Sequence, residues 1–132
     1  MMARKIVINT DHGGFGLSDA ALERYLELSG LKTYELGGSK YFAPPDMVLA
    51  AIEQARRERN YQYVNSLAFN DDALERDDPF LVRVVEEMGQ DAASRFAYLE
   101  VVEIPEDVEW QIEEYDGMEW IAEKHRVWRG KA

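Results

Sequence analysis

The segment Lys5-Ile6-Val7-Ile8-Asn9-Thr10-Asp11-His12-Gly13-Gly14 carries the clearest structural signal near the start of this chain. Its first five residues include three β-branched side chains, and the Asp-His-Gly-Gly end is typical of a turn, so the segment predicts a strand followed by a tight turn. Ser18 then stands at a helix N-cap position, and apolar residues recur at helical spacing as far as Gly30. We therefore expect a strand, a turn and a helix in this order.

Residues 31–36 alternate and end at Gly37-Gly38, which predicts a second strand directly after the helix. A strand, a helix and a strand this close together favour a βαβ unit, with parallel strands and a right-handed crossover. Residues 39–46 are expected to form a loop.

The middle of the chain predicts one helix and one further strand. Pro45 occupies a first helical position, and the helix ends near three arginines between residues 56 and 59, which complement the helix dipole. Residues 61–69 are aromatic and alternating, which indicates a strand, and residues 70–78 form an acidic loop.

Asp77-Asp78-Pro79 opens the best-marked helix of the sequence. Acids stand at the cap, proline takes the first helical position, an apolar stripe follows, and Gly89 ends the helix. A short helical turn is expected over residues 91–95. Residues 98–104 then predict a strand, which Pro105 stops.

The C-terminal part predicts a β-hairpin. Apolar and polar residues alternate from Val108 to Glu113, Asp116-Gly117 is a strong hairpin signal, and residues 118–122 form the returning strand. A helix over residues 118–128 competes, because apolar residues there also fit a helical face. The hairpin is narrowly preferred.

Together these elements predict one α/β (mixed α+β) domain over residues 1–132. We expect a three-layer-like arrangement with a mixed sheet of about five strands, a βαβ start and an antiparallel C-terminal hairpin.

Composition excludes several classes of protein. The 26 acids outnumber the 15 Lys and Arg, and the net charge of -11 argues against non-specific nucleic-acid binding. Without cysteine, the chain has no thiol nucleophile, zinc finger or disulfide framework. Apolar runs are too short for a membrane span and no signal-peptide core is present, so we expect a cytoplasmic protein. No cofactor is predicted.

The charges are unevenly distributed along the C-terminal region. Ten acids and no base occur from Glu100 to Glu123, whereas four bases lie between Lys124 and Lys131. Acids that alternate with apolar residues are typical of the solvent face of a sheet. A site for a basic partner and a cation site remain as alternatives, although no loop has the ligand spacing of an EF-hand, and no metal site is predicted.

Asp11, His12, Gly13, Gly14 and Ser18 form the candidate ligand-binding site. Glycine amides before a helix N-terminus favour a small anionic ligand, and ligands in parallel sheets bind at the carboxyl ends of strands. The structural alternative is that the glycines allow the turn and Asp11 caps it. No catalytic residues are assigned, because His12 has no identifiable Ser or Cys partner.

The same region resembles the N-terminus of ribose-5-phosphate isomerase B, a sugar-phosphate isomerase with a Rossmann-like sheet. The similar residues are Lys5, Asp11-His12-Gly13-Gly14-Phe15, Leu17, Tyr25-Leu26, Gly30 and Tyr34-Glu35-Leu36-Gly37. The resemblance implies that Asp11 and His12 contact substrate. The cysteine base and the later glycine-rich anion loop of that family have no counterpart in this chain.

A second resemblance extends over more of the chain. It is carried by Lys5-Ile-Val-Ile-Asn9, Gly13-Gly14-Phe15-Gly16-Leu17-Ser18, Arg76-Asp77-Asp78-Pro79, Leu81-Val82, Val84-Val85-Glu86-Glu87-Met88-Gly89, Val101-Val102-Glu103-Ile104-Pro105, Val108-Glu109-Trp110, Tyr115-Asp116-Gly117, Glu123-Lys124-His125-Arg126 and Trp128. These residues are similar to a functionally uncharacterised family of small acidic proteins encoded by phages and prophages. The resemblance implies a host-directed or accessory role without catalytic residues.

These observations favour a non-enzymatic binding protein, with a host protein or a small ligand as partner, over the alternative of a sugar-phosphate isomerase-like enzyme. Trp120, Arg126, Trp128 and Arg129 are the candidate interface residues, since aromatic residues and arginine are enriched in interfaces. Trp110 is expected to be a core residue. The basic tail and Trp128 favour a homodimer.

Overall fold

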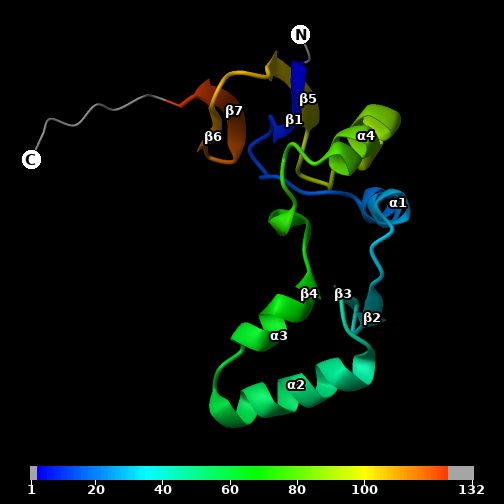
Figure 1. Ribbon diagram of the computed structural model, residues 1–132. Helices are drawn as coiled ribbons and strands as arrows, with labels where there is room; N and C mark the ends of the chain where they lie inside the picture. Colours follow the sequence, from blue (N-terminus) through cyan, green and yellow to red (C-terminus); the bar gives the residue numbers. More distant parts are fainter. Residues whose placement is uncertain (1–2, 125–132) are drawn as a thin grey trace, which may run out of the picture. The chain divides into compact units, whose positions relative to one another are not determined.

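The computed structural model describes residues 3–124 of the chain. By its internal contacts the chain divides into two compact units: one holds the residues up to Tyr25 and from Glu75 onward, and the other holds Leu26–Leu74. The described residues form helices and small antiparallel sheets (Figure 1), which confirms the mixed α+β class. Within residues 3–124, none of the helices has both the length and the apolar composition that a membrane span requires. That residues 1–132 form a single domain stays a prediction.

In the first unit, strand β1 (Ala3–Asn9) pairs antiparallel with strand β5 (Leu99–Pro105). The two strands lie side by side in Figure 1, with Ala3 opposite Pro105. Ile6 and Val7 are both fully buried, although successive residues of a strand point to opposite faces. Burial of both faces explains why this strand is continuously apolar.

Two helices of this region begin where the sequence predicts. Helix α1 (Asp19–Ser29) is capped by Ser18, whose Oγ accepts a hydrogen bond from the Ala21 N–H at 3.2 Å. Helix α4 (Pro79–Met88) is capped by Asp78, whose Oδ1 accepts from the Phe80 N–H at 2.8 Å. Helix α4 buries Leu81, Val82, Val84 and Val85. A short 3-10 turn, η2 (Gly89–Ala92), follows it, two residues earlier than expected.

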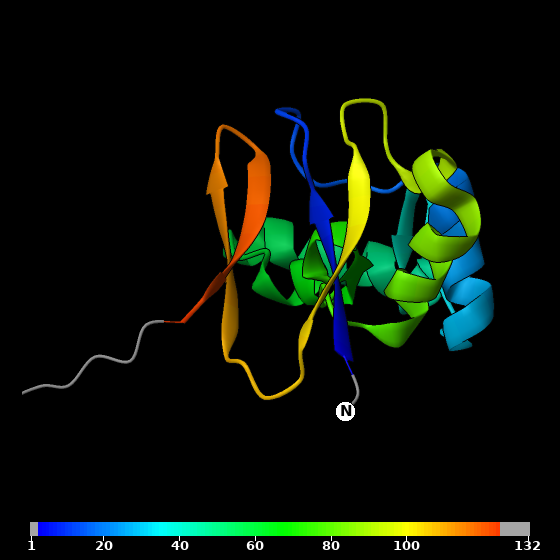
Figure 2. The same ribbon diagram turned by 90° about the horizontal axis from the view of Figure 1, so that it is seen from above.

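Strands β6 (Trp110–Tyr115) and β7 (Met118–Glu123) form the predicted C-terminal hairpin, which Figure 2 shows next to β1. Asp116 (φ 51) and Gly117 (φ 87) form the two-residue turn, and both are left-handed, as a type I′ turn requires. The hairpin is therefore confirmed, and the competing helix is wrong for residues 118–123.

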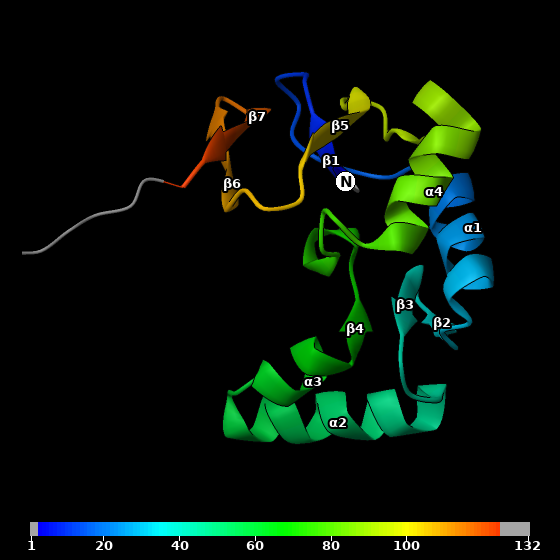
Figure 3. The ribbon, with the colours of Figure 1, turned by 45° about the horizontal axis from the view of Figure 1, so that its top comes forward.

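The second unit combines a small sheet with two helices (Figure 3). Strands β2 (Tyr34–Leu36), β3 (Ser39–Tyr41) and β4 (Ala68–Phe69) form the sheet in the order β2-β3-β4. Helices α2 (Pro45–Glu58) and α3 (Gln62–Leu67) share a core of Ala51, Ala55 and Val64, and a 3-10 turn, η1 (Asp71–Ala73), ends the unit.

The predicted βαβ unit is wrong. Strand β2 pairs antiparallel with β3 instead of lying parallel to β1. Gly37 (φ 59) and Gly38 (φ 82) supply the two left-handed residues of a hairpin turn, so β3 occupies an edge of β2. The predicted loop over residues 39–46 therefore contains a strand. The described residues hold three antiparallel sheets in place of one mixed sheet of about five strands.

The predicted strand over residues 61–69 is mostly helix. Val64 and Leu67 are three residues apart and pack on the α2 core, whereas Tyr61 and Tyr63 are exposed. Helical spacing buries the aliphatic pair on α2, and this burial outweighs the β propensity of the tyrosines. Only β4, at the end of the segment, is a strand.

Asp78 stabilises two elements with one carboxylate. In addition to its cap bond, its Oδ2 accepts a 2.6 Å hydrogen bond from the hydroxyl of Tyr25, which is buried in α1. We predict that Asp78→Ala lowers the free energy of unfolding by about 2–4 kcal/mol, because both the cap and a partly buried hydrogen bond to a charged group are lost. Asp77→Ala is the matched control and should cost under about 1 kcal/mol. Urea unfolding measures both, and equal losses would contradict this assignment.

Tyr25 makes the stability depend on alkaline pH. Burial, together with the hydrogen bond to Asp78 and its charge, raises the pKa of the Tyr25 hydroxyl above its ordinary value of 10.0. Above that ordinary pKa the unfolded chain loses the proton while the folded chain keeps it, so stability falls as pH rises.

We predict that Tyr25→Phe is less stable at neutral pH but loses less stability between about pH 9 and 11. Urea unfolding across this range tests the prediction, and parallel pH curves would contradict it.

Candidate functional site

Asn9 is the polar centre of the first unit and is fully buried at the end of β1. Its Nδ2 donates to the carbonyl oxygens of Asp11 (2.7 Å) and Gly117 (2.8 Å). Its Oδ1 accepts from the backbone N–H groups of Asp11 (3.3 Å) and Tyr98 (2.9 Å). One amide side chain thus joins the turn after β1, the segment before β5 and the hairpin turn.

A bidentate ion pair between Arg76 and Glu119 lies next to Asn9. The two Nη–Oε distances are 2.6 and 2.8 Å, and the side chains are only 19% and 10% exposed. Glu119 Oε1 also accepts the Asn9 backbone N–H at 2.7 Å. The Arg76 guanidinium lies 3.7 Å from the centroid of the Phe15 ring. Each charged group therefore has several partners.

The ion pair covers the edge of β1 that does not face β5. At the end of the β1–β5 pairing, the Thr10 N–H donates to the Tyr98 carbonyl. In an antiparallel pair the backbone N–H and C=O groups of alternate residues point toward the partner strand, so those of Val7 and Asn9 point away from β5. Val7 exchanges bonds with Arg76: its N–H donates to the Arg76 carbonyl (2.8 Å), and its carbonyl accepts from Nη1 (3.3 Å). Arg76 and Glu119 thus take the place of a neighbouring strand.

Asp11 and His12, which the sequence predicts as site residues, lie on the exposed turn after β1. Asp11 Oδ1 accepts the His12 backbone N–H at 2.7 Å, as the capping alternative requires. The His12 ring faces the hairpin turn, where its Nδ1 lies 3.6 Å from Asp116 Oδ2, and both side chains are more than half exposed. The geometry brings together one imidazole and one carboxylate in open solvent.

Gly13 and Gly117 allow close backbone packing around the turn after β1. A Cβ on Gly13 would overlap the carbonyl of Phe96. A Cβ on Gly117 would overlap the carbonyl of His12 and lie 2.9 Å from the Gly14 nitrogen. The Gly13-Gly14 backbone is therefore closely approached by two other segments, which leaves less room for an anion than a free glycine loop provides.

Ser18 is engaged in structure. Besides capping α1, its Oγ donates to the Asp91 carbonyl at 2.7 Å, and its N–H donates to the Ala92 carbonyl at 2.9 Å. These bonds attach the start of α1 to η2. Whether Asp11, His12, Gly13, Gly14 and Ser18 bind a ligand stays a prediction.

The outer face of the hairpin is aromatic and exposed. Directly opposed residues share a face, so Tyr115 lies with Met118, and Glu113 lies with Trp120. Tyr115 is 75% exposed and Trp120 is 45% exposed. Trp120 Nε1 donates to Glu113 Oε2 at 3.1 Å, and the other oxygen of Glu113 accepts from Gln111. The indole is therefore held in place although it faces solvent. We call Tyr115, Met118 and Trp120 the aromatic face.

Of the predicted interface residues, the structure thus places Trp120 on an exposed surface, whereas Arg126, Trp128 and Arg129 lie outside the described residues. Trp110 is half-buried. Within residues 3–124, no three or more His, Asp or Glu side chains are arranged to hold a metal ion.

Sequence reasoning missed Asn9, Arg76 and Glu119. Arg76 is the sole base among the acids of residues 70–78, and this was the sequence feature that could have indicated an ion pair. Its partner lies 43 residues away along the chain, and no local pattern identifies one acid among ten as that partner.

Comparison with known protein families, with curated proteins and with solved structures finds no match to this chain.

Loss of the Arg76 guanidinium should release the hairpin. We predict that Arg76→Ala lowers the free energy of unfolding by about 3–5 kcal/mol, because the largely buried Glu119 carboxylate loses its counter-ion. Arg83→Ala removes the exposed Arg83–Glu87 pair and is the control, with an expected change below about 1 kcal/mol. Urea unfolding compares the two variants. Glu119→Gln in the Arg76→Ala background should recover part of the loss, and no recovery would contradict the prediction.

Proposed function

We propose that this chain is a non-enzymatic binding protein of the small acidic phage type, and that its aromatic face binds a basic protein segment. The observation that carries the proposal is that Trp120, next to Tyr115, is exposed but held in place by its hydrogen bond to Glu113. On the opposite face of the hairpin, Glu119 forms an ion pair with Arg76. A rigid aromatic anchor loses little entropy on binding, which is typical of interface hot spots.

The negative charge of the hairpin region indicates what kind of partner it binds. Eight acids and no base occur from Glu106 to Glu123. One of them, Glu119, is neutralised by Arg76, and another, Glu113, accepts from Trp120. Of the other six, Glu114, Asp116 and Glu123 belong to the hairpin, and the remaining three lie in the connection that precedes it. Electrostatic complementarity therefore favours a partner with several Lys or Arg residues.

The chain itself contains a segment rich in Lys and Arg. Residues 124–131 include four bases and Trp128, so the occupant we favour is this segment of a second copy of the chain. In a two-fold dimer each copy offers one acidic hairpin and one basic segment, which makes the interface self-complementary. A host protein with a similar basic segment would compete for the same face.

Static light scattering at micromolar concentration tests the proposal. We predict a dimer for the full chain, a monomer for a truncation ending at Lys124, and weakening by high salt. Trp120→Ala should weaken dimerisation at least about 10-fold. Tyr63→Ala, an exposed aromatic on α3, is the matched control and should leave the dimer unchanged.

A second pair of variants separates charge from truncation. Arg126→Glu with Arg129→Glu should abolish the dimer, while Arg56→Glu with Arg57→Glu on α2 should leave it intact. A full chain that stays monomeric, or a dimer that survives both Trp120→Ala and truncation, overturns the dimer arrangement. Interconversion of ribose 5-phosphate and ribulose 5-phosphate that Asp11→Ala abolishes would favour the isomerase-like alternative instead.

A further inference from the structure

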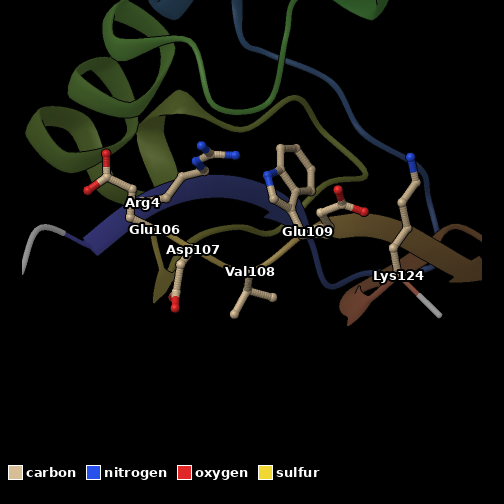
Figure 4. Close-up of a pocket in the computed structure, with 7 residues that line it drawn as sticks. Arg4, Glu106, Asp107, Val108, Glu109 and Lys124 are labelled. Carbon is tan, nitrogen blue, oxygen red and sulfur yellow. The ribbon is translucent and has the colours of Figure 1, made fainter. Parts of the chain in front are cut away.

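A pocket of about 380 Å³ lies where the β5–β6 connection passes the start of β1 and the end of β7 (Figure 4). Its lining residues are Arg4, Glu106, Asp107, Val108, Glu109, Trp110 and Lys124. The size is within the range of small-molecule sites in proteins.

The pocket has a base and an acid at each end. Arg4 pairs with Ile104 at the end of β5, close to Glu106, and the Lys124 N–H donates to the Glu109 carbonyl at 2.9 Å. In Figure 4, Arg4 and Glu106 lie toward one end, Glu109 and Lys124 lie toward the other, and Asp107 points away from Arg4. Trp110 supplies an aromatic wall.

These charges are available for a ligand. Among the described residues, neither Arg4 nor Lys124 forms an ion pair with a carboxylate, and neither Glu106 nor Glu109 forms one with a basic side chain. Other bases of the chain, such as Lys5 and Arg76, have carboxylate partners at 2.6 to 2.8 Å. A ligand therefore meets charges of both signs without first breaking an internal pair.

We propose that this pocket binds a free α-amino acid with an aromatic side chain. The carboxylate of such a ligand meets Arg4 or Lys124, its ammonium group meets Glu106 or Glu109, and its ring packs on Trp110. A simple anion would be repelled by the carboxylates of the lining, and a simple cation would be repelled by Arg4 and Lys124. A zwitterion has one charged group for the basic side chains and one for the carboxylates.

This site is distinct from the aromatic face. Trp110 lies opposite Glu123, and along β7 Glu123 alternates with Trp120, so Trp110 and Trp120 are on opposite faces of the hairpin. Ligand binding at Trp110 therefore does not require the dimer contact at Trp120.

Isothermal titration of the full chain with L-phenylalanine tests the proposal. We expect a Kd of about 1 mM or below, with 3-phenylpropanoate and 2-phenylethylamine each at least about 10-fold weaker, because each lacks one charged group. Arg4→Gln, Lys124→Gln and Trp110→Leu should weaken binding, and Arg56→Gln on α2 is the matched control. Circular dichroism verifies that each variant is folded.

Three results would overturn the proposal: no binding at about 10 mM L-phenylalanine, equal affinity for 3-phenylpropanoate, or binding that all three pocket variants leave unchanged. Trp120→Ala separates the two sites. If that variant loses the dimer and retains L-phenylalanine, both proposals are supported. If the full chain is monomeric and still binds L-phenylalanine, only the dimer proposal fails.

Discussion

The ion pair between Arg76 and Glu119 is the interaction on which the first unit depends most. It joins a loop, the edge of β1 and the hairpin at one point, with Asn9 beside it. Removing two charges from water is costly, and the cost is offset only when both groups are well paired. Two guanidinium donors and the Asn9 N–H on the Glu119 carboxylate, together with the Phe15 ring under Arg76, meet this condition.

This anchoring gives the hairpin two different sides. Glu119 faces inward, and its neighbour Trp120 faces outward because side chains alternate along β7. A two-stranded hairpin alone is only marginally stable in water. Held against β1 by this ion pair, the hairpin presents Trp120 in a fixed position, with Glu113 on the same face. This arrangement is the basis of our proposal that the chain binds a partner through a fixed surface.

The turn after β1 illustrates how one short pattern has two explanations. Asp11, Gly13 and Gly14 match a ligand-binding pattern, yet each also has a structural task here. Asp11 caps the turn, Gly13 admits the Phe96 carbonyl, and Gly14 adopts a left-handed conformation (φ 84). Close packing and a positive φ both favour glycine, as an anion site does, because a Cβ is unfavourable in each case. The pattern by itself therefore does not identify a catalytic site.

Local signals in the sequence determined the elements that depend on neighbouring residues. Asp78 and Pro79 define the start of α4, and Asp116-Gly117 defines the hairpin, because caps and tight turns involve only a few adjacent residues. Tertiary structure decided that β1 pairs with β5, about ninety to one hundred residues away. The Gly37-Gly38 turn that brings β2 back on β3 is a local signal, which the βαβ prediction overlooked. Tertiary structure also decided that residues 62–67 are helical and that Glu119 is the partner of Arg76. Each of these outcomes depends on burial against another element of the fold, and such contacts leave no local pattern in the sequence.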